Sequence, residues 1–149
     1  MIEKEFLLQD IKTIAREVYS HILLKAHAEH ATIVAFHGEL GVGKTTLIKE
    51  LAHLLGISEH DIASPTFGIM HFHDIQEEHS VLFRKLVHID AYRLENPDEI
   101  EILDWENIKN TQSNLVCVEW PEKIENKMFP DTIHIHLTHV DEVKRKISY

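Results

Sequence analysis

The stretch from Gly38 to Thr46 constrains the fold of this chain more than any other part of the sequence. It reads Gly-Glu-Leu-Gly-Val-Gly-Lys-Thr-Thr and matches G-x-x-x-x-G-K-[ST], the P-loop pattern that binds nucleotide phosphates. An apolar, β-branched run over 31–37 precedes it, as in a buried strand, and leucines recur at helical spacing over 47–55. Because a strand, a glycine-rich turn and a helix are the context that this motif requires, the sequence predicts a nucleotide-binding site.

The residue types in this stretch suit phosphate binding. Glycines allow backbone N–H groups to turn toward phosphate oxygens, and the positive end of the following helix faces the same anion. In this pattern Lys44 contacts the β- and γ-phosphates, and the hydroxyl of Thr45 ligates Mg²⁺.

Length and composition limit the class of protein. The chain has 149 residues, which suits one domain with a sizeable core, and its 44% hydrophobic and 27% charged content is typical of soluble globular proteins. No apolar run approaches a membrane span, and the N-terminus lacks a signal-peptide pattern. The single cysteine, Cys117, excludes an internal disulfide. We therefore expect a cytoplasmic protein with no membrane association.

The charge balance bears on possible partners. Acidic residues outnumber basic ones by 25 to 15, which gives a formal net charge of −10. A broad nucleic-acid-binding surface needs positive charge instead. We expect no DNA binding, and we expect any action on RNA to pass through a partner protein.

The chain contains 13 histidines, and two pairs alternate in expected strands: His71 with His73, and His134 with His136. Alternation places both rings of a pair on one face of a strand, where they could hold a metal ion. No cysteine or carboxylate is spaced to complete a zinc site. The pattern therefore favours the solvent-facing side of an edge strand.

The order of elements predicts the fold class. Hydrophobic periodicity and turn residues indicate strands over 2–8, 31–37, 68–73, 81–90, 115–120, 132–137 and 143–148, helices over 11–28, 47–55 and 97–109, and a short helix or turn over 121–128. Asp10 is placed to cap the first helix, and Gly56 to end the second. We expect an α/β fold, a single three-layer P-loop NTPase-like domain over 1–149. Its central sheet would be mostly parallel, with added antiparallel strands from a hairpin whose tip lies near 74–80.

Two carboxylates follow apolar strands and compete for a role at the nucleotide. Asp90 ends the strand 86–90, and Glu119 lies at the end of the strand 115–120. Ligands of open α/β sheets lie beyond the carboxyl ends of the strands, so both acids are candidates for holding Mg²⁺ or for positioning the attacking water. Composition does not assign the two roles. Thr66, in the loop 64–67, is a weaker candidate for a switch-like residue.

Four blocks together resemble the TsaE (YjeE) family of small bacterial P-loop ATPases. They occur in family order and at similar spacings: Gly38–Thr46, Ser-Pro-Thr-Phe over 64–67, His-Ile-Asp-Ala-Tyr-Arg-Leu over 88–94, and Val-Glu-Trp-Pro over 118–121. None of the three later blocks is specific for this family on its own. The four blocks together, in this order and at these spacings, are specific for it. The segment around Gln9 and Asp10, where relatives approach the adenine, has no clear motif here.

The resemblance implies a set of site residues for ATP and Mg²⁺. Phosphate-holding residues would be Gly41, Val42, Gly43, Lys44, Thr45 and Thr46. Thr45 and Glu119 become the Mg²⁺ ligands, and Asp90 becomes the acid near the γ-phosphate and the attacking water. The loop 64–67, with Thr66, becomes switch-like, and Trp120 would lie close to the nucleotide.

The resemblance also implies a biological role. TsaE-like proteins bind and hydrolyse ATP in the formation of N6-threonylcarbamoyladenosine (t6A) at position 37 of tRNA. They act with TsaB and with TsaD, the transferase, so tRNA would be met only through that complex.

Three other functions use the same motif. A small-molecule kinase is the main alternative, although only three arginines follow the P-loop and no arginine-rich lid segment appears. A GTP-dependent switch lacks its guanine-reading Asn/Thr-Lys-x-Asp motif. The third is a binding module that nucleotide switches on and off and in which nucleotide hydrolysis is incidental. This function overlaps the role that the TsaE resemblance implies.

Overall fold

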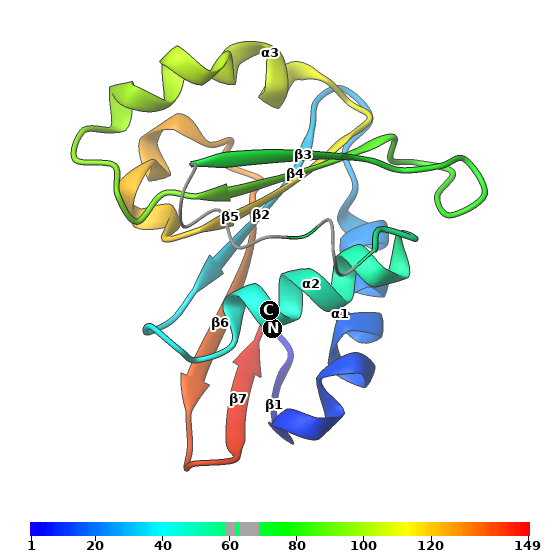
Figure 1. Ribbon diagram of the computed structural model, residues 1–149, viewed down its shortest axis with the longest axis vertical. Helices are drawn as coiled ribbons and strands as arrows, with labels where there is room; N and C mark the ends of the chain where they lie inside the picture. Colours follow the sequence, from blue (N-terminus) through cyan, green and yellow to red (C-terminus); the bar gives the residue numbers. More distant parts are fainter. Residues whose placement is uncertain (59–61, 63–68) are drawn as a thin grey trace.

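A seven-stranded mixed sheet forms the centre of the computed structural model, which describes residues 1–58, 62 and 69–149 (Figure 1). The strands are β1 (Glu3–Leu7), β2 (Thr32–His37), β3 (Met70–Asp74), β4 (Lys85–Asp90), β5 (Asn114–Glu119), β6 (Ile133–His139) and β7 (Lys144–Ser148). Their order is β1-β7-β6-β2-β5-β4-β3. The four central strands, β6, β2, β5 and β4, run parallel, so their carboxyl ends meet at one edge of the sheet.

Antiparallel strands extend both sides of this parallel centre. On one side β3 pairs with β4, as the predicted hairpin requires, and on the other β7 pairs with β6 and with β1. The two chain ends therefore lie together, and the amide of Ile2 donates a hydrogen bond to the carbonyl of Tyr149. The α/β class and the added antiparallel strands were predicted correctly. The described sheet is mixed and not mostly parallel, because three of its pairings are parallel and three antiparallel, and the β1–β7 pairing was not anticipated.

Helices cover both faces of the sheet. One face carries α1 (Ile11–Lys25) and α2 (Lys44–Leu54), and the other carries α3 (Trp105–Asn110) and the short 3₁₀ helices η3 (Pro97–Leu103), η4 (Pro121–Lys123) and η5 (Glu125–Lys127) (Figure 1). A further 3₁₀ turn, η1 (Leu8–Asp10), leads into α1.

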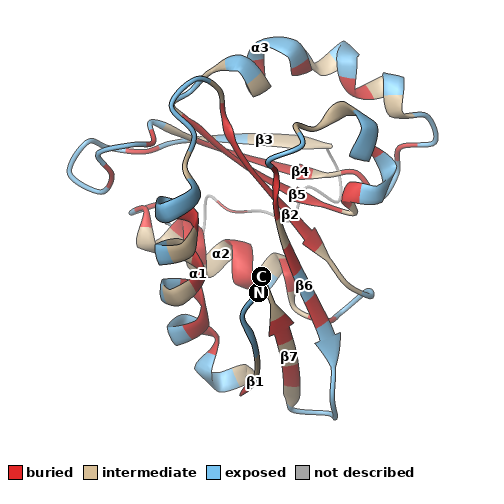
Figure 2. Ribbon diagram, turned by 180° about the vertical axis from the view of Figure 1, so that it is seen from behind, coloured by how far each residue is buried: buried red, intermediate tan, exposed pale blue. Residues whose placement is uncertain are grey.

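Alternate side chains of each strand supply two separate cores. In β5, Leu115 and Cys117 pack toward α1 and α2, whereas Val116 and Val118 pack toward α3. The strand β5 is buried along its whole length and β2 along all but its last residue, and the helices expose their outer sides (Figure 2). This double burial explains why the strands are continuously apolar, as parallel strands covered on both faces are.

Several predicted elements differ in detail. The helix expected over 97–109 is divided at Asp104, whose φ of 60° is left-handed, so a 3₁₀ helix and a short α-helix replace it. Asn96 and Glu99 form a capping box at its start. Asp10 occupies the N-cap position of α1, as predicted, but its side chain makes no capping hydrogen bond. Gly56 follows α2 at a φ of 75°, as expected for a helix-ending glycine.

The histidine prediction was wrong in two respects. His71 and His73 do lie on an edge strand, β3, but both are half-buried, while Phe72 between them is 51% exposed. His134 and His136 lie on β6, an interior strand between β2 and β7. Alternation fixes only that two rings share a face, and tertiary packing decides which face and which strand.

None of the helices in the part of the chain that the structure describes is long and apolar enough to cross a membrane.

Candidate functional site

The P-loop joins β2 to α2 and depends on glycine at three positions. Gly38, Gly41 and Gly43 have φ values of 142°, 76° and 113°, where other residues are strained. At Gly38 a Cβ atom would also stand 2.5 Å from the carbonyl oxygen of Leu137. At Gly41 and Gly43 it would meet nothing within 4 Å, so the backbone there borders open space. These are the features of a loop that a ligand can approach closely.

Lys44, the first residue of α2, is 6% exposed and turns back into the loop. Its Nζ atom donates hydrogen bonds to the carbonyls of Gly38, at 2.5 Å, and Glu39, at 3.0 Å. It also lies 4.3 Å from the centre of the Trp120 ring. Burial lowers the pKa of Lys44 and outweighs the opposing attraction of Glu119, Glu122 and Asp90. A cation thus stands where the loop would meet phosphate.

Thr45 and Glu119 are in direct contact although 74 residues separate them. The Thr45 hydroxyl donates a hydrogen bond of 2.6 Å to Oε1 of Glu119, a carboxylate that is only 3% exposed. Burial alone would raise the pKa of Glu119, but His88, the Thr45 hydrogen bond and Lys44 outweigh it, and the net pKa is lowered. Glu119 is therefore held in its ionised form.

Asp90 ends β4 directly beside Glu119 in the sheet register. Its Oδ1 atom accepts a hydrogen bond of 3.0 Å from the backbone N–H of Tyr92. Burial, assisted by the charge of Glu119, raises the pKa of Asp90, while the Tyr92 hydrogen bond, His88 and Lys44 oppose that shift. The two strand-end acids thus have pKa values that are shifted in opposite directions, which is typical of carboxylates with different chemical roles.

Trp120 reaches the site through an unusual backbone conformation. Its φ of 56° is left-handed, which is rare for a bulky residue and costs on the order of 1–3 kcal/mol. The conformation turns the chain directly after β5 and brings the ring over Lys44 and within 5.0 Å of the Tyr92 ring. A cation over an indole face adds a favourable contact.

The remaining predicted residues lie at different depths. Val42 is buried in the core, and Thr46 is exposed on the first turn of α2. Thr66 and the rest of the loop 64–67 lie outside the described residues. Lys44, Thr45, Asp90, Glu119 and Trp120 come together at the carboxyl ends of β2, β4 and β5.

A family model described as "Threonylcarbamoyl adenosine biosynthesis protein TsaE" matches residues 9–147. The chain belongs to the TsaE family. A Haemophilus influenzae relative named "tRNA threonylcarbamoyladenosine biosynthesis protein TsaE" is 31% identical over 126 residues, which are 85% of this chain and 75% of the relative. A Bacillus subtilis relative with the same name is 32% identical over 142 residues, 95% of this chain and 79% of the relative.

A solved structure has a similar fold. The crystal structure of Bacillus subtilis YdiB superposes with a TM-score of 0.66 at 26% identity, and the match covers 98% of this chain and 82% of that chain. The resemblance to the TsaE family that the four sequence blocks indicated is thus confirmed.

Two residues that support this TsaE-family site were not predicted from the sequence. His88 is fully buried on β4, with Nε2 3.4 Å from Oε1 of Glu119. The sequence does contain a signal for His88. It lies two residues before Asp90 in one strand, which places both side chains on the same face of the sheet. Arg145 is 6% exposed on β7 and donates from Nε to the carbonyl of Val42 at 3.2 Å, which braces the P-loop. Nothing in the local sequence identifies that contact, because 103 residues separate the partners.

Proposed function

We propose that this TsaE-family protein binds and hydrolyses ATP with Mg²⁺, on a P-loop NTPase-like fold, in support of t6A formation in tRNA. Its partners would be TsaB and TsaD, and the place of action the cytoplasm. The observation that carries the proposal is the contact between Thr45 and Glu119 directly beside Lys44. It joins a hydroxyl, an ionised carboxylate and a cation at the start of one helix, next to a positive-φ glycine loop.

The residues present fit a Mg²⁺ ion and a nucleotide triphosphate. Mg²⁺ prefers hard oxygen ligands, and Thr45 and Glu119 offer a hydroxyl and a carboxylate 2.6 Å apart. The hydrogen bond between them would be exchanged for bonds to the ion. When bound, Mg²⁺ neutralises charge on the β- and γ-phosphates.

Lys44 would exchange its partners in a similar way. Its two hydrogen bonds to loop carbonyls satisfy a buried cation, and phosphate oxygens would replace them. The Trp120 ring limits the directions that the Lys44 side chain can take. The lysine is thus held close to its binding position.

Asp90 is the better candidate for positioning the attacking water. A carboxylate whose pKa is raised accepts a proton more readily than an ordinary one. Glu119, whose pKa is lowered, is the weaker base and the better metal ligand. The opposite shifts therefore favour the division of roles that the family resemblance implies.

We expect slow hydrolysis by the protein alone and faster hydrolysis with its partners. Transition states of phosphoryl transfer need positive charge beyond Mg²⁺ and the P-loop lysine, and an added arginine contributes about 10³–10⁵-fold in related enzymes. Arg145 is committed to backbone carbonyls of the P-loop and β7, and Arg93 is exposed three residues beyond Asp90. Neither is placed for this role among the described contacts, so a partner would supply the missing charge.

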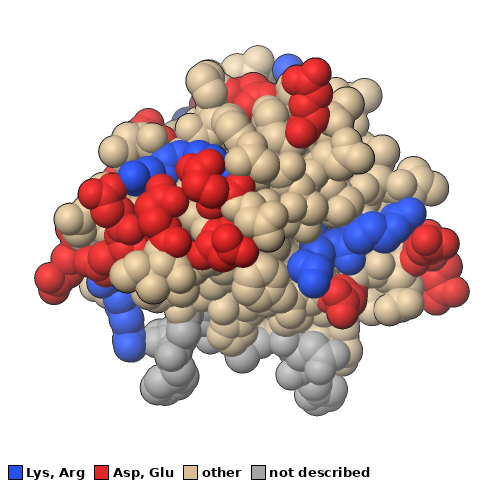
Figure 3. Space-filling model, turned by 90° about the horizontal axis from the view of Figure 1, so that it is seen from above, with Lys and Arg blue, Asp and Glu red and all other residues tan. Residues whose placement is uncertain are grey.

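The surface charge predicts how such a partner binds. Acidic side chains gather on one side of the face that carries η3 and α3 (Figure 3), where Asp98, Glu101, Asp104 and Glu106 are exposed. Together with a net charge of −10, they favour a basic partner surface. Stimulation should therefore fall as salt rises, because screening shortens the reach of surface charges.

The test is phosphate release by the protein alone and with TsaB and TsaD, over a salt series. We expect stimulation at low salt that declines with ionic strength. Fast turnover alone, unchanged by the partners, would contradict the proposal and favour a self-sufficient enzyme such as a small-molecule kinase. Analysis of phosphorylated products separates that case.

A further inference from the structure

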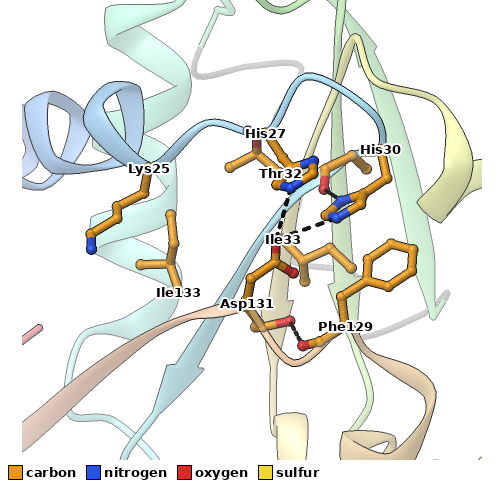
Figure 4. A pocket seen from close by; sticks show the side chains of 10 residues that line it. Lys25, His27, His30, Thr32, Ile33, Phe129, Asp131 and Ile133 are labelled. Atoms are coloured by element: carbon orange, nitrogen blue, oxygen red, sulfur yellow. Dashed lines mark hydrogen bonds and ion pairs between the residues drawn. The ribbon is translucent and has the colours of Figure 1, made fainter.

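Two histidines and an aspartate meet at the end of β2 opposite the P-loop. His27 and His30 come from the segment between α1 and β2, and Asp131 comes from the segment that precedes β6 (Figure 4). One ligand atom from each lies within 4.8 Å of the other two. They border a small cavity of about 10 Å³, roughly the room of one water-sized sphere.

The spacing of these atoms fits metal ligands as well as it fits a loose ion pair. His27 Nε2 lies 3.5 Å and His30 Nε2 3.3 Å from Oδ2 of Asp131. Charge-assisted N–H···O hydrogen bonds are shorter, about 2.7–2.9 Å. Zinc ligands about 2.0–2.2 Å from the ion at tetrahedral angles lie about 3.3–3.6 Å from one another. Both measured distances fall within that range.

The hydrogen bond of His30 places a lone pair toward the carboxylate. Nδ1 of His30 lies 2.9 Å from the carbonyl oxygen of Ala31, and because a carbonyl only accepts, Nδ1 must carry the proton. In the neutral ring, Nε2 then presents its lone pair to Oδ2 of Asp131 at 3.3 Å. The Nε2 lone pair and the carboxylate oxygen are both acceptors, so they repel each other unless a proton or a metal ion lies between them. A ring nitrogen bonded to a backbone carbonyl is also the usual support of a metal-binding histidine.

Packing fixes the His30 ring in this orientation. It stacks on Phe129 at 4.0 Å between centroids on one side and on His27 at 3.8 Å on the other. Its side chain is 17% exposed, compared with 38% for His27 and 46% for Asp131. His30 is therefore the fixed ligand, and the other two are free to adjust.

His27 would have to move to complete the site. Its ring is parallel to that of His30, within 6°, and its Nδ1 accepts a hydrogen bond of 3.2 Å from the backbone N–H of Glu29. Metal binding through Nε2 requires the ring to tilt out of the stack and release that contact. The hydrogen bond is exposed to solvent and can be replaced by water, and the His27 side chain is 38% exposed, so its ring can turn toward solvent.

We propose that His27, His30 and Asp131 bind one divalent transition-metal ion, with Zn²⁺ as the best fit. Two imidazoles and a carboxylate are a ligand set that Zn²⁺ accepts, with water in the fourth position. The ion joins the segment before β2 to the segment before β6, which are neighbouring parallel strands. It therefore stabilises the base of the strand that carries the P-loop, and it is separate from the Mg²⁺ ligands at the other end.

The test is titration calorimetry of the chelator-treated protein with ZnCl₂, together with thermal unfolding with and without Zn²⁺. The wild-type protein should bind about one equivalent and unfold at a higher temperature with the ion, because an ion that binds only the folded state stabilises it. Asp131→Asn, which keeps the size of an exposed side chain, should weaken binding by at least about 10- to 100-fold, the loss that even supporting residues of metal sites produce. His134→Ala is the control, because it removes a histidine that lies outside the proposed site. This variant should bind Zn²⁺ like the wild type.

Cobalt gives a second readout that does not depend on activity. Co²⁺ in this site should produce visible d–d absorption that Zn²⁺ abolishes and that Asp131→Asn lacks. The proposal is wrong if the wild type does not bind Zn²⁺, which would mean that a proton joins His30 to Asp131. It is equally wrong if Asp131→Asn binds like the wild type, or if His134→Ala removes the binding.

Discussion

Replacing Lys44 by alanine is expected to lower the affinity for Mg-ATP by about 10²-fold or more, since each hydrogen bond to a charged group contributes about 1.5–3 kcal/mol. Lys44 has a cationic Nζ that makes two hydrogen bonds within the P-loop, and the bound triphosphate would receive at least as many. The fold should survive, because burial already lowers the pKa of this lysine and so makes its charge costly to keep. Titration calorimetry with Mg-ATP measures the loss.

Lys49→Ala provides the matched control for this prediction. Lys49 belongs to the same helix, α2, but lies five residues further along and is half-buried. Its replacement changes the net charge equally and should leave the affinity within a few-fold of wild type. Unchanged affinity in Lys44→Ala would mean that the P-loop is not the phosphate-binding site.

The two acids should give opposite phenotypes when each is replaced by its amide. Asp90→Asn should lower the rate of hydrolysis by about 10²–10⁴-fold, the usual contribution of a general base, and leave Mg-ATP binding nearly unchanged. Glu119→Gln should reduce the gain in nucleotide affinity that Mg²⁺ provides. It should have a smaller effect on the nucleotide affinity measured without metal. Phosphate release and calorimetry over a Mg²⁺ series distinguish the two. If Asp90→Asn gives the metal phenotype and Glu119→Gln does not, the roles are reversed.

Thermal unfolding checks that Asp90→Asn acts on chemistry and not on folding. Because burial raises the pKa of Asp90, its contribution to stability is present below the ordinary pKa and is lost as the pH rises through the raised one. At neutral pH the ionised carboxylate therefore costs stability. Asparagine removes that charge and still accepts the Tyr92 hydrogen bond, so its melting temperature should equal or exceed that of the wild type.

Local patterns predicted the parts of the site that are local in sequence. The strand, loop and helix around Gly38–Thr46 follow from glycine positions and hydrophobic periodicity, and the structure has them where expected. Asp90 and Glu119 could be placed at one edge because parallel strands end together. Their direct adjacency depends on the register of β4 against β5, which no motif specifies.

The remaining features depend on contacts between distant segments. The left-handed backbone of Trp120 and the bracing of Val42 by Arg145 arise from packing that is settled only in the folded chain. The helix expected over 97–109 divides at Asp104 although its apolar pattern is continuous, because one left-handed residue redirects the chain toward the buried Trp105. Hydrophobic periodicity reports which side of a segment is buried, not whether its backbone stays regular.

The proposed function links ATP turnover at this P-loop to t6A formation. The most direct measurement is the t6A content of tRNA, by mass spectrometry of nucleosides, in bacterial cells depleted of their own TsaE protein and supplied with this chain. Wild-type protein and Lys49→Ala should restore t6A, whereas Lys44→Ala and Asp90→Asn, expressed at equal levels, should not. Full restoration by Lys44→Ala would mean that t6A formation does not need nucleotide binding at this P-loop. No restoration by the wild type, in cells whose own TsaE gene does restore t6A, would mean that this chain does not act in t6A formation.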